Sequence, residues 1–163
     1  MNSEPTAYLR LQAAVAAAYN FFISGMIAGL MYHKADFVPT DAVSLALDIT
    51  ITCLLTFAIT TPFCRASLRR DKTGGVLIAK TPQARLLARL FQHPVLLSTF
   101  LGLGAALILS VLKVSFFVLI GVTAMPFYLY VAFKSVFAAG LGVLATCTVL
   151  YAGMCHRQDT FRV

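Results

Sequence analysis

Apolar residues in this chain run in four long stretches that are separated by shorter polar segments. The stretches cover about residues 11–32, 42–63, 95–117 and 127–154. A helix needs about 20 residues to cross the hydrocarbon core of a bilayer, and each stretch is long enough. The pattern predicts an all-α integral membrane protein with four transmembrane helices packed as a bundle. Residues 1–163 then form a single membrane domain.

The composition supports a membrane environment. Hydrophobic residues make up 60% of the chain and charged residues 12%, whereas a soluble domain has about 25% charged residues. The first stretch is longer than the core of a signal peptide, which has about 7–15 residues, so we interpret it as a retained helix.

The basic residues predict the topology. Seven of the thirteen lie between the second and third stretches, one precedes the first stretch and two follow the fourth. With four spans these regions share one side, which the positive-inside rule makes cytoplasmic. Both termini are therefore expected inside the cell, in a multi-pass protein of the cell membrane. The net charge of +7 is explained by topology and does not predict nucleic-acid binding.

The basic loop, about residues 64–94, contains a candidate interfacial helix. Thr81 and Pro82 are typical of a helix start. After them apolar positions fall on one helical face, and Arg85 and Arg89 fall on the other. We expect this short helix to lie on the inner leaflet, with its arginines against anionic lipid headgroups. Docking onto a cytoplasmic partner is the alternative.

Polar residues form a stripe along the second stretch. Asp48, Thr52 and Thr56 follow one another at intervals of four, so they share a helical face. A charge within a membrane helix costs about 2.5–3.5 kcal/mol on insertion scales and therefore needs a partner, a cavity or a function. Hydrogen bonds to carbonyls of their own helix are sufficient to explain the threonines. The carboxylate of Asp48 is the residue that makes a hydrophilic path as plausible an interpretation as helix packing.

The fourth stretch carries a lysine that matches Asp48 in depth. Lys134, Ala138 and Gly142 are four residues apart, which places the lysine above small residues that let another helix approach. At 1.5 Å per residue, Asp48 and Lys134 both lie about 10–12 Å below the outer boundary. We predict that they form an ion pair.

The first and third stretches supply further packing and polar positions. Asn20 lies near mid-membrane, where an amide bonds to another helix, and Gly25 and Gly29 form a weak helix-association motif. Lys113, near the outer end of the third stretch, is expected to reach the headgroups. The apolar segment 114–125 is either a continuation of the third span or a re-entrant element.

The sequence predicts no metal or other cofactor. The four cysteines form no CxxC pair and have no zinc-binding spacing, so they are interpreted as small apolar residues. A membrane enzyme using His33, Asp36 and Asp41 near the outer surface is a minor alternative, since no nucleophile with a base is visible.

Two functional hypotheses remain. In the first, the protein is a transporter or channel subunit that moves an ion or small solute past Asp48, Lys134, Asn20, Thr52 and Thr56. Four helices rarely enclose a whole pathway, so this hypothesis implies a homo-oligomer, most simply a dimer. In the second, the protein is a structural or accessory subunit of a membrane complex, and the Asp48–Lys134 pair fixes which helices pack together.

Overall fold

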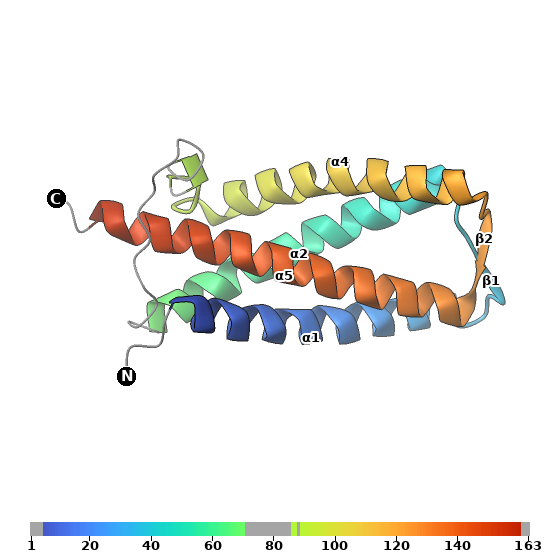
Figure 1. Ribbon diagram of the computed structural model, residues 1–163, viewed down its shortest axis with the longest axis horizontal. Coiled ribbons are helices and arrows are strands. Elements are labelled where there is room, and N and C mark those ends of the chain that lie inside the picture. Colours follow the sequence, from blue (N-terminus) through green and yellow to red (C-terminus); the bar gives the residue numbers. More distant parts are fainter. Residues whose placement is uncertain (1–4, 71–85, 88, 161–163) are drawn as a thin grey trace.

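The computed structural model describes residues 5–70, 86–87 and 89–160. Four long helices make up nearly all of it (Figure 1): α1 (Pro5–Tyr32), α2 (Ala42–Arg70), α4 (Pro94–Ile120) and α5 (Phe127–Thr160). Each is long and apolar enough to cross a membrane, and many large apolar side chains on their outer faces are exposed. The prediction of a membrane protein with four spanning helices is confirmed at this level.

Three helices end later than the hydrophobic pattern predicted, and one of them, α5, continues to Thr160 instead of ending at 154. α2 continues through Pro62 to Arg70 instead of ending at 63, and the two basic residues of its last turn suit the negative end of a helix dipole. α4 continues to Ile120, so residues 114–120 belong to a long third helix and are not re-entrant. Gly121 ends that helix with a φ of 70°, a left-handed conformation that glycine adopts without strain.

A short antiparallel strand pair joins the two connections at one end of the molecule, which the sequence analysis did not predict. β1 (Phe37–Pro39) follows α1, β2 (Ala124–Pro126) precedes α5, and Val38 pairs with Met125. The Thr40 hydroxyl extends the junction by donating to the Val122 carbonyl at 2.9 Å. Val38 is buried. Backbone hydrogen bonds and side-chain packing therefore both connect the helices at this end of the molecule.

The helices pack as an open series. α1 packs along α5, α5 packs on α2, and α2 packs along α4, whereas α1 with α2 and α4 with α5 are not among the closely packed pairs. The main core lies between α2, α4 and α5 and includes Ile49, Leu97 and Val149. Each loosely packed pair of helices leaves a groove, one on either side of the central helices.

The predicted interfacial helix lies mostly outside the described residues, including Arg85. Among those described, Leu86, Leu87, Arg89 and Leu90 are helical, and the Arg89 side chain is exposed. Phe91 is buried in the main core, with the Arg65 guanidinium 5.3 Å from its ring centroid. The end of this segment therefore packs on α2 and α5.

Candidate functional site: a charge cluster beside a groove

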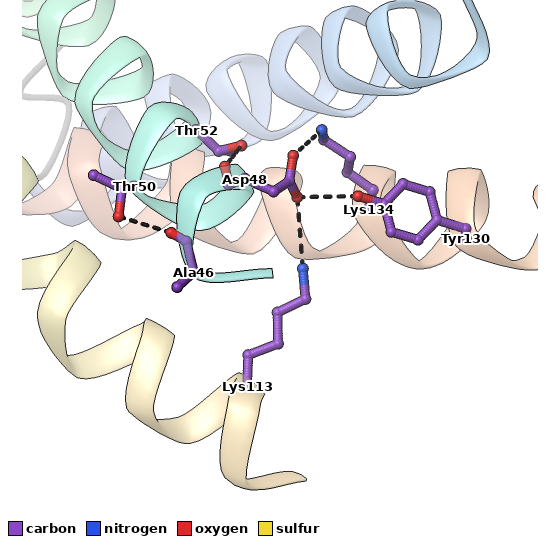
Figure 2. A network of polar contacts seen from close by, with 7 residues as sticks. All are labelled: Ala46, Asp48, Thr50, Thr52, Lys113, Tyr130 and Lys134. Atoms are coloured by element: carbon purple, nitrogen blue, oxygen red, sulfur yellow. Dashed lines mark hydrogen bonds and ion pairs between the residues drawn. The ribbon is translucent and has the colours of Figure 1, made fainter. Parts of the chain in front are cut away.

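Asp48 lies at the centre of a cluster of polar side chains from three helices (Figure 2). Lys134 of α5 donates a hydrogen bond to Asp48 Oδ1 and forms an ion pair with it. The Tyr130 hydroxyl donates to Oδ2 at 3.2 Å, and Lys113 Nζ of α4 lies 3.7 Å from the same oxygen. Both carboxylate oxygens thus face donors.

The helix geometry explains why these residues meet. Asp48 lies in the second turn of α2, Lys134 in the second turn of α5, and Lys113 in the penultimate turn of α4. At 1.5 Å per residue, all three are about 10 Å from the helix ends that the strand pair joins. The equal depth predicted for Asp48 and Lys134 therefore agrees with their contact, and Lys113 lies at the same depth.

The prediction that Lys113 reaches the headgroups is wrong. Its side chain is only 4% exposed, and Nζ lies 5.3 Å and 5.1 Å from the ring centroids of Phe133 and Phe137. These phenylalanines are one turn apart on α5, so both rings face the ammonium group. Attraction to the rings and to Asp48 holds the lysine inside. Nζ has no hydrogen-bond partner among the described residues.

The cluster contains two lysines and one carboxylate. The side chains of Lys113 and Lys134 are 4% and 7% exposed, and that of Asp48 is 16% exposed. Charges removed from water in this way are expensive unless they are paired. With all three groups ionised, the cluster has an excess of one positive charge within the membrane.

A groove between α1 and α2 runs past this cluster, and we call it the charged groove. It encloses about 470 Å³. All five residues predicted to line a pathway contribute to its wall, although they come from three helices: Asn20, Asp48, Thr52, Thr56 and Lys134. Lys113 lies behind Asp48 and is not part of the lining.

Several polar groups along the charged groove are bonded within the protein, whereas the buried Thr146 hydroxyl in its wall has no hydrogen-bond partner among the described residues. The Thr52 hydroxyl donates to the Asp48 carbonyl oxygen at 2.6 Å, and Asn20 Nδ2 donates to the Ala16 carbonyl oxygen at 2.8 Å. The Thr56 hydroxyl donates to Asn20 Oδ1 at 3.5 Å and links α2 to α1. These groups consequently do not need water to satisfy them.

The predicted packing residues differ in their surroundings. A Cβ atom added to Gly142 would come within 2.5 Å of Asn20 Nδ2 and 3.0 Å of the Ala16 carbonyl oxygen, so α1 crosses α5 closely there. A Cβ at Gly25 would come within 2.5 Å of Ser135 Oγ, and Ala138 is fully buried. At Gly29 a Cβ would meet nothing within 4 Å.

The polar residues near the strand pair do not belong to the cluster around Asp48 and have local contacts of their own. His33 Nδ1 lies 2.8 Å from the Leu30 carbonyl oxygen, and Asp36 is exposed. Asp41 accepts a hydrogen bond from the Ser44 backbone N–H at 3.0 Å and so caps the start of α2. This bond lowers the pKa of the Asp41 carboxyl. Cys53 and Cys64 are buried free thiols.

A second groove lies between α4 and α5, and we call it the apolar groove. It encloses about 670 Å³ and is lined by residues such as Phe57, Phe100 and Leu144. Its only hydroxyl among the lining residues belongs to Thr148, which bonds back to the Leu144 carbonyl oxygen at 2.8 Å. No ionisable side chain lines it in the described part of the chain.

Comparison of the chain with protein-family models, with curated proteins and with solved structures finds no match.

Proposed function

We propose that this protein is a membrane transport protein, acting as a transporter or channel subunit that moves an ion or a small solute along the charged groove. The single observation that carries the proposal is the common location of the five polar residues. Asn20, Thr52 and Thr56 continue the line from Asp48 and Lys134 along one groove. Ionisable residues inside a membrane are costly and commonly mark substrate pathways.

The proposal includes an orientation and an oligomeric state. The excess of lysine and arginine at the ends opposite the strand pair supports a topology in the cell membrane with both termini in the cytoplasm and the strand pair outside. The charged groove is open along one side, and rim residues such as Ile59 and Phe63 are 61% and 63% exposed. A second copy facing this side would enclose the pathway in a two-fold dimer.

The alternative function is that of a structural or accessory subunit in a membrane complex. The number of donors around Asp48 favours it, because a carboxylate that faces Lys134, Tyr130 and Lys113 is suited to fixing the positions of α2, α4 and α5. A buried polar contact of this kind serves to specify packing more than to add stability.

Flux measurements separate the two functions. Purified protein would be reconstituted in liposomes, and the entry of chloride, acetate, potassium and protons followed with internal fluorescent indicators. Transport predicts flux of at least one of these above protein-free liposomes, and a loss of about tenfold in Lys134→Gln. Lys34→Gln changes an exposed lysine outside the groove and should retain full flux. An accessory role predicts no flux from the native protein, with Lys134→Gln impaired in stability alone.

A further inference from the structure

We infer that the charged groove binds a single-chain anionic amphiphile drawn from the bilayer, with its acidic head at Lys134 and its hydrocarbon chain along α1 and α2. This inference names the solute class for the proposed function, and it rests on that function for any role in transport. Charge, wall chemistry, size and depth each support it.

The charge of the cluster favours an anion. The Asp48 oxygens already face three donors, so a cation would have to displace them and would meet two lysines. An ammonium group carries three N–H donors, and among the described residues the only recorded partner of Lys134 Nζ is Asp48. Lys134 also lines the groove. An acidic head placed there would balance the excess positive charge.

The walls beyond the cluster suit a hydrocarbon chain. They are formed mainly by aliphatic and aromatic side chains such as Ile23, Ile27 and Leu55. The Thr52, Thr56 and Asn20 groups between them already have partners within the protein, so covering them with a chain leaves none of these bonds unmade. Because the wall is mostly apolar, a hydrated ion would find few polar partners along the groove.

The size of the groove indicates one chain. Its lining extends from Asp48 to Cys64 along α2, which corresponds to about 24 Å of helix. A volume of about 470 Å³ spread over that length has room for one extended chain beside the helices.

The depth of the cluster is also suitable. The four helices contain 27 to 34 residues and are therefore about 40 Å long or more, whereas the hydrocarbon core is about 30 Å thick. A cluster about 10 Å from the helix ends then lies about 5 Å inside the hydrocarbon edge. An acidic head drawn in from the interface would meet Lys134 while its chain lies along the groove, at the depth of the hydrocarbon core.

The absence of tryptophan from the chain permits a direct binding test. Tyr19 lines the charged groove and is 61% exposed, and Phe100 lines the apolar groove and is 59% exposed. The variants Tyr19→Trp and Phe100→Trp each carry one fluorophore at a matched exposed position. Both would be placed in nanodiscs of zwitterionic lipid and titrated with dibromostearate, its neutral methyl ester and the corresponding amine, because bromine quenches nearby tryptophan.

We expect dibromostearate to quench Tyr19→Trp at about tenfold lower concentration than the ester or the amine. The basis is that a hydrogen bond to a charged group is stronger than one between neutral groups, and a tenfold change in affinity corresponds to about 1.4 kcal/mol. Phe100→Trp should show no preference among the three probes. Adding Lys134→Gln to Tyr19→Trp should remove the preference, and Lys134→Arg should retain it.

Three results would overturn the inference: equal quenching of Tyr19→Trp by the three probes, a carboxylate preference that survives Lys134→Gln, or the same preference in Phe100→Trp. The first comparison needs no change in the cluster, so it stands even if Lys134→Gln does not fold. Binding without flux of chloride, acetate, potassium or protons in the liposome assay would retain the amphiphile site and reject a pathway for small ions. Flux of a small ion without the carboxylate preference would retain transport and reject the amphiphile.

Discussion

The two grooves of this protein have similar positions and different chemistry. Each separates a pair of helices that do not pack closely, and the apolar groove is the larger, at about 670 Å³ against about 470 Å³. Lipid chains can fill the apolar groove without leaving a polar group unsatisfied. The charged groove contains Asp48 and Lys134, which a lipid-facing surface does not require. The two grooves therefore differ in charge independently of their size, and a costly charge within a membrane is the stronger reason to propose a site.

The largest expected effect is at Asp48, whose charge distinguishes the charged groove from the apolar groove. Asp48→Asn leaves two lysines close together without a carboxylate, and removing one partner of a buried ion pair costs about 3–5 kcal/mol. We expect a loss of this size in the free energy of unfolding, measured in detergent by circular dichroism. Asp41→Asn is the matched control, because Asp41 is exposed and asparagine also caps helices. Equal stability of the two variants would contradict a central role for Asp48.

Changing the contact between α1 and α5 tests whether the charged groove depends on close helix packing. Gly142→Ala places a methyl group against Asn20 and the Ala16 carbonyl, and overpacking of this kind costs about 1–3 kcal/mol. Gly140→Ala is the control on the same helix, since a Cβ there meets nothing within 4 Å. The same unfolding measurement applies, and a Gly142→Ala protein as stable as Gly140→Ala would show that α1 is held by other contacts.

A second substitution should partly reverse the effect of Asp48→Asn. In the double variant Asp48→Asn/Lys113→Gln only Lys134 keeps its charge, so the repulsion between the lysines is removed. We expect recovery of about 1–2 kcal/mol relative to Asp48→Asn alone, obtained from a double-mutant cycle. Additive losses would mean that Lys113 is stabilised by Phe133 and Phe137 independently of Asp48.

Tyr130→Phe removes one donor from the cluster and keeps the ring in contact with Tyr32, whose centroid lies 5.4 Å away. Loss of a single hydrogen bond to a carboxylate should cost about 1.5–3 kcal/mol when the site is dry and less when water replaces the hydroxyl. Tyr128→Phe, at an 84% exposed tyrosine in the same helix turn, should have no effect. A Tyr130→Phe variant as stable as this control would indicate that water reaches Asp48.

The smallest expected effect distinguishes a chain from a hydrated ion in the charged groove. The Thr52 hydroxyl bonds to its own helix, so Thr52→Val should change stability by less than about 0.5 kcal/mol. It should also leave quenching of Tyr19→Trp by dibromostearate within about twofold, as Thr148→Val in the apolar groove should. A large loss for Thr52→Val alone would favour a polar, water-lined path.

The sequence by itself determined the number of long apolar helices and the unusual residues within them. Hydrophobic length defines a membrane span because the hydrocarbon core has a set thickness, and the span is helical because backbone exposed to lipid must bond internally. Helical periodicity was sufficient to align Asp48 with Thr52 and Thr56, and the rise per residue was sufficient to match the depths of Asp48 and Lys134. The spacing of residues along the chain is therefore sufficient to predict both the shared helical face and the matched depth.

Only the tertiary structure decided which helices are neighbours, and that decision changes the chemistry of the site. Lys113 has the same distance from its helix end as Lys134, but its burial depends on α4 lying beside α2 and on the phenylalanine rings of α5. The strand pair depends on backbone bonds between segments more than 80 residues apart, which short apolar strands do not reveal in a sequence. The charge excess and the two grooves follow from the order α1, α5, α2, α4, because charge balance and open space are properties of neighbours that no single segment encodes.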